Sequence, residues 1–333
     1  MVVALAIPHR ASVAPHARHT RAPPHTHARA RNSPVLPTEL FLRIIECHLA
    51  DSPTRTRDLA LYAQVDIDCD DGKVAGLARA FDPECHSMRE LAVTTQAPCT
   101  TLTVLVNKAL KGSLAVLCLS ECRLGDAGLA SIADALSSAK HLRELCLSSN
   151  GLTHHSTPLI AAILERTSSL KNLRLYGNEL GPRGAHHIAR ALHTNRTLEG
   201  LWIGQNGIGP LGARSLGTAL TTGCPTLAVL DVVGNWIGPA GARDLAAGVS
   251  GSKALRGVRV SDNAIGDTGA AAFARLLEDQ NRGLRYLHVD RNGISAAGVW
   301  ALRVAADKCE AMETLDVWGN AHEDDEDATS SLH

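Results

Sequence analysis

Several Cys residues have types and spacings that suit metal binding or thiol chemistry. Cys118 and Cys122 are separated by four positions, and Cys146 follows Cys118 by 28. Thiolates bind zinc and other soft cations, and neighbouring thiols can oxidise together to a disulfide. If residues 28 apart lie on adjacent strands, Cys118 and Cys146 are neighbours, whereas Cys122 points into a turn. Two thiols with no nearby His pattern are too few for a zinc site, so we predict no metal site.

Asp and His residues also form groups that resemble ligand sets. The stretch Asp66 to Gly72 alternates Asp as a calcium-binding loop does, but Asp71 occupies the position that requires Gly and Leu77 the position of the bidentate Glu. We interpret it as a polar loop. The pairs His154–His155 and His186–His187 are predicted to be solvated histidines on helix or turn surfaces.

The sequence holds no recognisable catalytic machinery. No G-x-x-x-x-G-K-[ST] phosphate-binding loop occurs, and no nucleophile, base and orienting group can be identified. Asn195-Arg196-Thr197 is a glycosylation sequon, which has meaning only in a secreted chain. We therefore expect neither an enzyme nor a cofactor.

A ten-residue pattern, NLRLYGNELG at Asn172–Gly181, recurs along most of the chain and must position any functional residue. Its copies align on a turn residue that is Asn in every copy but the first. The intervals of 28 or 29 residues lie in the range of leucine-rich repeats. The aligned positions are Cys122, Asn150, Asn178, Asn206, Asn235, Asn263, Asn292 and Asn320.

Each copy fits L-x-x-L-x-L-x-x-N-x-L, as at Leu170, Leu173, Leu175, Asn178 and Leu180. Alternating leucines predict a short strand with one buried face, and the Asn side chain can satisfy backbone groups of a buried turn. A Gly six positions later begins a helical pattern in most copies, with one apolar stripe. Strand and helix alternate, and helices need more width than strands. The sequence therefore predicts an α/β leucine-rich repeat solenoid, a horseshoe with an inner parallel sheet and outer helices.

If the leucines are structural, the outward residues between them carry the function. The chain is only 3% aromatic, yet several aromatic residues fall on outward strand positions, accompanied by charged ones. Tyr, Trp and Arg often anchor protein interfaces. The alternative is that the aromatic residues only pack against one another across neighbouring strands. The predicted partner-binding residues are Arg174, Tyr176, Trp202, Asp231, Arg259, Tyr286, His288, Asp290 and Trp318.

The strand–helix pattern with N-x-[LI]-G and a Gly before the helix resembles the ribonuclease-inhibitor-like class of leucine-rich repeats. That class includes the Ran GTPase-activating protein and the C-terminal repeats of nucleotide-binding NLR receptors. The resemblance covers residues 112–320 and implies about eight repeats. Since these relatives do different things with one scaffold, it implies a fold more than a function.

The segment at 34–111 differs in character and is predicted to be helical. Leu36, Pro37, Leu40 and Ile44 resemble the first helix of an F-box, which implies docking on the adaptor subunit of a cullin ubiquitin ligase. The alternative is an N-terminal cap that covers the apolar edge of the first coil. Met88, Leu91 and Val93 add a degenerate strand to the stack in this interpretation.

Composition and charge limit the compartment and the partners that we expect. Nine scattered Cys favour reduced thiols in a cytoplasmic or nuclear protein, and a net charge of −1 gives no basic field for nucleic acid. No apolar run approaches the roughly 18 residues of a membrane span. Residues 1–33, rich in Arg, His and Pro, are interpreted as a disordered leader or a mispredicted start, with an organelle-targeting peptide as the alternative. Residues 321–333 form an acidic tail.

Two functions follow as hypotheses. The first is a non-catalytic scaffold whose concave face binds a protein partner, as a substrate receptor of a cullin ligase if the F-box interpretation holds. The alternative, implied by the resemblance, is an activating protein for a Ran-like small GTPase. Such an activator orients its partner's own groups for GTP hydrolysis.

Overall fold

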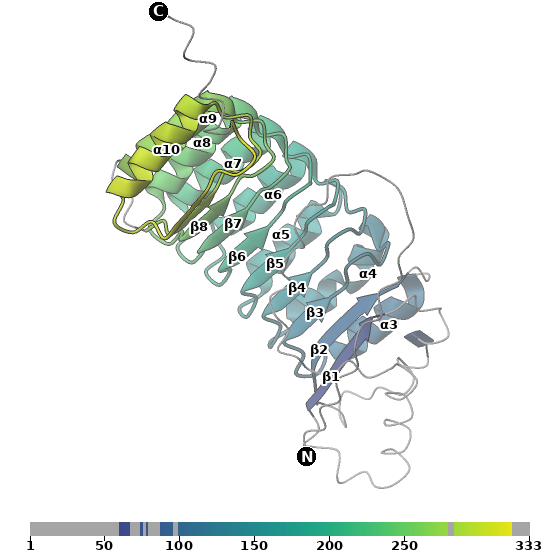
Figure 1. Cartoon of the computed structure of the whole chain (residues 1–333). Helices are drawn as coiled ribbons and strands as arrows, with labels where there is room; N and C mark the ends of the chain where they lie inside the picture. Colours follow the sequence, from purple (N-terminus) through teal and green to yellow (C-terminus); the bar gives the residue numbers. More distant parts are fainter. Residues whose placement is uncertain are drawn as a thin grey trace, which may run out of the picture.

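A computed structural model describes residues 60–66, 74–75, 78, 87–95, 99–278 and 283–321. In these residues, ten parallel strands form one sheet in chain order, β1 to β10 (Figure 1). The strands are β1 (Ala60–Asp66), β2 (Ser87–Thr94), β3 (Val116–Cys118), β4 (Glu144–Cys146), β5 (Asn172–Arg174), β6 (Gly200–Trp202), β7 (Val229–Asp231), β8 (Gly257–Arg259), β9 (Tyr286–His288) and β10 (Thr314–Asp316). The helices are α3 (Cys99–Ala109), α4 (Gly125–Ser138), α5 (Thr157–Arg166), α6 (Gly181–Leu192), α7 (Gly209–Thr222), α8 (Gly238–Gly251), α9 (Gly266–Glu278) and α10 (Ala296–Lys308).

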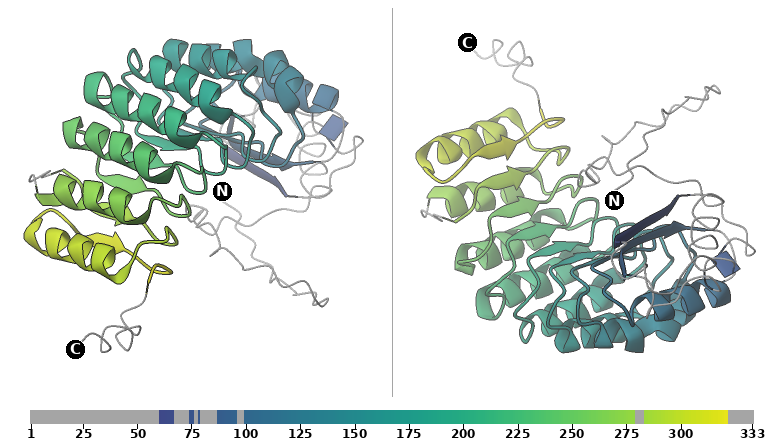
Figure 2. Two further views of the ribbon diagram at one scale, coloured as in Figure 1. Left: turned by 90° about the horizontal axis from the view of Figure 1, so that it is seen from above. Right: turned by 90° about the horizontal axis from the view of Figure 1, so that it is seen from below.

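Strands and helices alternate along the chain, and the coils stack into an arc. The helices line the outer side and the sheet lines the inner side (Figure 2). Corresponding repeat positions pair directly, so that Leu173 pairs with Leu201 and Leu201 with Leu230. The predicted leucine-rich repeat solenoid is confirmed, and residues 28 or 29 apart are lateral neighbours on one sheet.

The repeated leucines form the core between sheet and helices. Leu173, Leu175 and Leu180 of one copy are buried, while Asn172 and Arg174, which alternate with them, stay partly exposed. Since successive strand residues point to opposite faces, this burial sends Arg174 and its counterparts to the concave surface.

The repeated Asn residues join consecutive coils through their amides. Asn235 is fully buried; its Oδ1 accepts from the backbone N of Asn206 at 2.8 Å, and its Nδ2 donates to the carbonyl of Ile203 at 2.9 Å. The same pattern occurs at Asn150, Asn178, Asn263, Asn292 and Asn320. At Asn206 the oxygen accepts from the backbone N of Leu180 at 3.4 Å, and the nitrogen donates to the Leu175 carbonyl. Each amide therefore satisfies backbone groups of a turn that is closed to water.

The Gly residues six positions after the Asn allow the outer helices to pack closely. A Cβ atom on Gly212 would lie 2.8 Å from Ile208 Cβ and 2.9 Å from Ala185 Cβ, so a larger residue would push α7 away from α6. The second copy has Ser156 there. Its buried hydroxyl donates to the Thr153 carbonyl at 2.8 Å, and α5 begins one residue later, at Thr157.

The segment at 34–111, expected to be helical, contributes β1, β2 and α3 in its described part. β2 contains the strand predicted around Met88 to Val93, whereas β1 was not predicted. The sheet therefore continues two strands beyond the eight repeats. Leu36, Pro37, Leu40 and Ile44 lie outside the described residues, as do residues 1–33 and 322–333. No helix in the described part combines the length and the hydropathy needed to cross a lipid bilayer.

Candidate partner-binding site

The register aligns one outward side chain from each repeat strand into a row across the concave face. These residues are the last ones of β3 to β10, and each pairs with its counterpart on the next strand. The row reads Cys118, Cys146, Arg174, Trp202, Asp231, Arg259, His288 and Asp316. It contains five of the nine predicted partner-binding residues, and the other four flank it on the same strands or just after them.

Arg174 and Trp202, neighbours in this row, form a stacked pair. The guanidinium carbon of Arg174 lies 4.9 Å from the centre of the Trp202 ring, and its Nη1 donates to Glu144 Oε2 at 3.0 Å. A Cβ atom on Gly200 would collide with the same ring. Trp202 is therefore clamped between Gly200 and a salt-bridged Arg, a cation–π arrangement that fixes the ring before any partner arrives.

The ring of Tyr176 likewise lies against a glycine of the next repeat, Gly204, just after β6. A Cβ atom on Gly204 would lie 2.7 Å from Tyr176 Cδ2, so the absence of a side chain at Gly204 makes room for the ring. Burial, followed by the negative charges of Asp231 and Asp262, raises the pKa of the Tyr176 hydroxyl. This phenol stays neutral at physiological pH.

Asp231 and Arg259 form the next pair along the row. The buried Asp231 accepts from the backbone N of Val233 at 3.1 Å through Oδ1 and from Arg259 Nη1 at 3.0 Å through Oδ2. Both carboxylate oxygens therefore have fixed partners, and Arg259, which is partly exposed, can still reach solvent.

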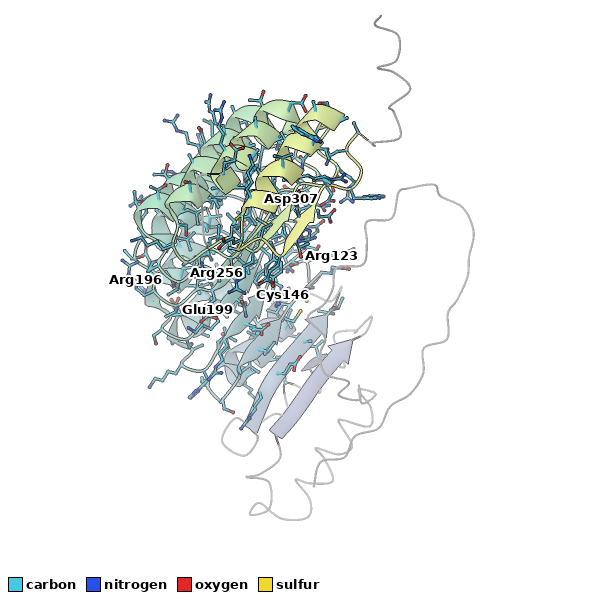
Figure 3. The ribbon with its side chains drawn as sticks, turned by 60° about the vertical axis from the view of Figure 1, so that its left-hand side comes forward. Arg123, Cys146, Arg196, Glu199, Arg256 and Asp307 are labelled. Carbon is cyan, nitrogen blue, oxygen red and sulfur yellow. The ribbon has the colours of Figure 1, made fainter. Side chains whose placement is uncertain are left out.

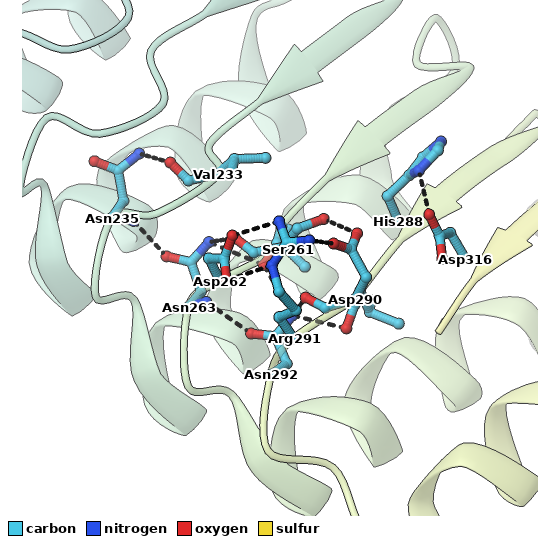
Figure 4. A network of polar contacts seen from close by, with 12 residues as sticks. Val233, Asn235, Ser261, Asp262, Asn263, His288, Asp290, Arg291, Asn292 and Asp316 are labelled. Atoms are coloured by element: carbon cyan, nitrogen blue, oxygen red, sulfur yellow. Dashed lines mark hydrogen bonds and ion pairs between the residues drawn. The ribbon is translucent and has the colours of Figure 1, made fainter. Parts of the chain in front are cut away.

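A denser polar network lies at β8 to β10 (Figure 4). Arg291 donates from Nε and Nη2 to the two oxygens of Asp262 at 2.8 and 2.6 Å, and its Nη1 lies 3.2 Å from Asp290 Oδ2. The hydroxyl of Ser261 donates to the other oxygen of Asp290. The Arg291 guanidinium also lies 5.7 Å from the ring centre of Trp318, whose side chain is 64% exposed.

His288 and Asp316 close the row. His288 Nδ1 lies 3.4 Å from Asp316 Oδ2, and Asp316 Oδ1 accepts from the backbone N of Trp318 at 3.1 Å. One ligand-type atom from each of His288, Asp290 and Asp316 lies within 4.8 Å of the others. We predicted no metal site from the sequence, where we considered Cys and paired His residues and not this trio, whose members lie in two repeats and come together because positions 28 apart are neighbours on the sheet.

Tyr286 precedes the row at the edge where the strands begin. Its hydroxyl donates to Glu313 Oε2 at 2.6 Å, and Arg285 Nη1 donates to Glu313 Oε1 at 2.6 Å. Glu199 and Arg256, which directly precede β6 and β8, lie on the same edge (Figure 3). Charged groups therefore border the row on this side.

Cys118 and Cys146 are register partners, as predicted, and both carry thiols. The Ser120 hydroxyl lies 3.4 Å from one sulfur and 3.1 Å from the other. Hydrogen bonding between the two sulfurs lowers the pKa of Cys146 and raises that of Cys118.

The other sequence candidates lie away from the row. Asn195 of the sequon is buried and structural, since its amide donates to the Leu164 carbonyl at 2.7 Å and accepts from the Leu198 N at 2.8 Å. His186 is exposed, while His187 Nδ1 contacts Thr157 Oγ1 at 2.8 Å. The stretch 67–72 of the calcium-like loop lies outside the described residues.

Comparisons with known proteins agree with the repeats. A family model described as "Leucine Rich repeat" matches residues 223–246 and 254–274. No curated protein matches the chain significantly.

Among solved structures, a tropomodulin C-terminal domain of Caenorhabditis elegans is 15% identical, with a TM-score of 0.37 over 54% of this chain and 92% of the other. A structure titled "Leiomodin-1 Actin-Binding Site 2 (ABS2)" is 17% identical, with a TM-score of 0.37 over 54% of this chain and 90% of the other. Neither likeness bears on what this chain binds. Its repeat pattern and its alternating strands and helices give the chain the fold of a leucine-rich repeat solenoid, and the family model matches part of that solenoid.

Proposed function

We propose that the chain is a non-catalytic scaffold that binds a protein partner on the concave face, at the row from Arg174 to Asp316 and its flanking aromatic residues. The observation that carries this proposal is the prior ordering of the Trp202 ring by Arg174 and Gly200. A ring held in one orientation loses little conformational entropy on binding, so its contacts contribute more fully to affinity.

The exposure of the other aromatic residues also supports partner binding at the concave face. Trp318 is 64% exposed and Tyr286 is 41% exposed, and both stand beside charged groups with fixed partners. Exposed aromatic side chains surrounded by polar groups are typical of protein interfaces. Trp202 and Trp318 each have an Arg guanidinium over the ring, and the Tyr176 ring lies against Gly204.

The proposal is tested by affinity purification from native extract, comparing wild type with the double variant Arg174→Ala, Trp202→Ala. We expect a defined set of co-purifying proteins to be lost, since the loss of two central contacts costs about 2–4 kcal/mol or more in binding. The matched control is Trp300→Ala. This Trp is 66% exposed but lies on α10, on the outer side.

Partners retained equally by the double variant and the control would place the binding site elsewhere. Each partner found is then remeasured with purified components, and the circular dichroism of the variants confirms that the fold is unchanged.

The narrower role as a substrate receptor of a cullin ubiquitin ligase is supported only by the pattern at Leu36, Pro37, Leu40 and Ile44. If it holds, cullin and adaptor subunits co-purify with the concave double variant and are lost with Leu40→Ala, Ile44→Ala. Retention by both variants, or absence from wild type, removes this role while leaving the scaffold proposal intact.

The resemblance to the Ran GTPase-activating protein supports the alternative, activation of a Ran-like GTPase. GTP turnover by purified Ran, measured with and without this chain, decides it. A rate that does not change with added protein excludes the activator, whereas an increase of a thousandfold or so would displace the scaffold proposal.

A further inference from the structure

We propose that His288, Asp290 and Asp316 form a binding site for one divalent transition-metal cation of the zinc, cobalt or manganese class. The site lies on the concave face between β9 and β10 (Figure 4). This inference goes beyond the proposed function, because it needs no protein partner.

The three side chains converge because of the register. His288 pairs with Asp316 on the neighbouring strand, and Asp290, two residues after His288, points to the same face. One ligand atom from each lies within 4.8 Å of the other two. Ligands at about 2.0–2.2 Å from a metal stand roughly 3–4 Å apart, so small side-chain rotations complete the geometry.

The ligand types select the class of cation. An imidazole with two carboxylates suits zinc, cobalt, nickel and manganese, whereas calcium and magnesium prefer oxygen ligands alone. The three side chains leave further coordination positions for water. His288 and Asp316 are 28% and 39% exposed, which gives an ion access from solvent.

A comparison within the repeats shows that Asp316 differs from its counterpart Asp231. Each is the last residue of its strand, and its Oδ1 accepts at 3.1 Å from the backbone N two residues later. The second oxygen of Asp231 receives Arg259, a permanent cation, at 3.0 Å. The second oxygen of Asp316 faces His288 at 3.4 Å, and imidazole is a side chain that commonly binds metal ions.

The local charge also favours a cation. Arg291 makes two bonds to Asp262 and touches Asp290 only at 3.2 Å. The carboxylates of Asp262, Asp290 and Asp316 around the one guanidinium of Arg291 leave an excess of negative charge, which a divalent cation balances.

Asp290 is prepared for this role by its surroundings. Its side chain is only 10% exposed, and the Ser261 hydroxyl holds one oxygen, so the carboxylate is oriented before an ion enters. Bonds to the ligand residues from outside the first coordination sphere typically raise metal affinity, and losing them costs about 10–100-fold.

The test is calorimetric titration of the full chain with Co²⁺ and with Zn²⁺, in the absence of any partner. We expect one site per chain with a cobalt absorption spectrum in the visible range. His288→Gln and Asp316→Asn should each weaken this site at least about tenfold. The matched control is Asp231→Asn, which removes the same charge at the equivalent position beside Arg259 and should leave the cobalt site unchanged.

Weak binding to other His or Cys side chains remains in all variants and is subtracted by this comparison. The proposal is overturned if wild type shows no site that depends on His288 and Asp316, or if Asp231→Asn weakens binding as much as Asp316→Asn does. Two ligand variants are used because one of them could fail to fold. Circular dichroism shows whether each variant keeps the fold. Since no partner is present, loss of the scaffold activity and loss of metal binding are separate outcomes.

Discussion

At the level of single residues, the amide of the repeated Asn both accepts and donates hydrogen bonds to the backbone. Its oxygen accepts from two backbone N–H groups of the preceding coil, while its nitrogen donates to carbonyls of both coils, as Asn263 does toward Asn235, Ile237, Val232 and Val260. The amide therefore fixes the turn and links two coils at once. A hydrophobic residue would fill the volume and leave these backbone groups unpaired.

Asn235→Ala should accordingly destabilise the chain by roughly 3 kcal/mol, because several buried backbone groups of two coils lose their partners together. Urea unfolding followed by circular dichroism measures the change. Arg243→Ala on the exposed side of α8 is the control and should cost less than about 0.5 kcal/mol. A loss at Asn235 as small as that of the control would show that water replaces the amide.

Sequence alone predicted which side chains face outward, because the alternation of leucines fixes the face of every strand residue. It did not predict which of them pair. Arg291 was absent from the predicted site although it contacts Asp262 and Asp290 and stacks on Trp318. Its direction depends on a left-handed backbone, with φ of 52°, that a non-glycine residue rarely adopts. The equivalent positions Gly177 and Gly234 are left-handed too, but a Gly in other copies does not reveal where the side chain of Arg291 goes.

At the level of secondary-structure elements, two coils have a Thr or a Ser where the others have a glycine, and its hydrogen-bond acceptor is a carboxylate instead of a backbone carbonyl. In the regular coils, the Gly three positions after the Asn donates its N–H to the next coil, as Gly209 does to the Asn235 carbonyl at 3.0 Å. Thr153 and Ser295 occupy that position in two coils. Each instead donates its N–H and hydroxyl to an Asp of the preceding coil, Asp126 or Asp267.

Asp126→Ala should therefore cost about 1–2 kcal/mol at pH 7, since two hydrogen bonds to a charged acceptor are lost. Burial raises the pKa of Asp126, but the hydrogen bonds from Thr153 and Ser156, together with the nearby His155, outweigh it and lower the pKa. The stabilisation is thus fully present above the unfolded-state pKa of about 3.9 and disappears as the pH falls through the lower folded-state value.

Urea unfolding at pH 7 and at pH 3 tests this dependence. The difference between wild type and Asp126→Ala should be smaller at pH 3. Asp134→Ala, on the exposed face of the same helix, should show little effect at either pH. A difference that stays constant with pH would mean that the side chain acts by packing rather than by its charge.

The elements of the regular copies followed from the 28-residue period, whereas those that depart from it did not. β1 was missed because Ala60–Asp66 has neither the leucine alternation of a repeat strand nor a following Asn. β1 pairs in parallel with β2, and the register of this pairing shifts between Leu61 and Tyr62. Pairing with a neighbour can impose a strand that local sequence leaves undetermined.

At the level of the whole molecule, the solenoid is a one-dimensional stack in which the main contacts join neighbouring elements. The outer helices approach most closely at α7 and α8, where a Cβ atom on Gly248 would collide with the backbone of Gly217. In such a stack, stability is approximately a sum over coils and their interfaces. The cost of removing a core leucine should therefore depend on its position along the arc.

Leu230 and Leu315 occupy the same place in their coils and test this dependence. Leu230 lies between two covered strands and is 1% exposed, whereas Leu315 on β10 is only partly buried. Leu230→Ala should cost about 3–5 kcal/mol, through lost burial and a cavity that rigid neighbours cannot fill, and Leu315→Ala about 1 kcal/mol. Urea unfolding of both variants, read by circular dichroism with the slope compared, gives the two values. Equal losses would mean that the last coil is packed as tightly as the central ones and that the stack unfolds as a single unit.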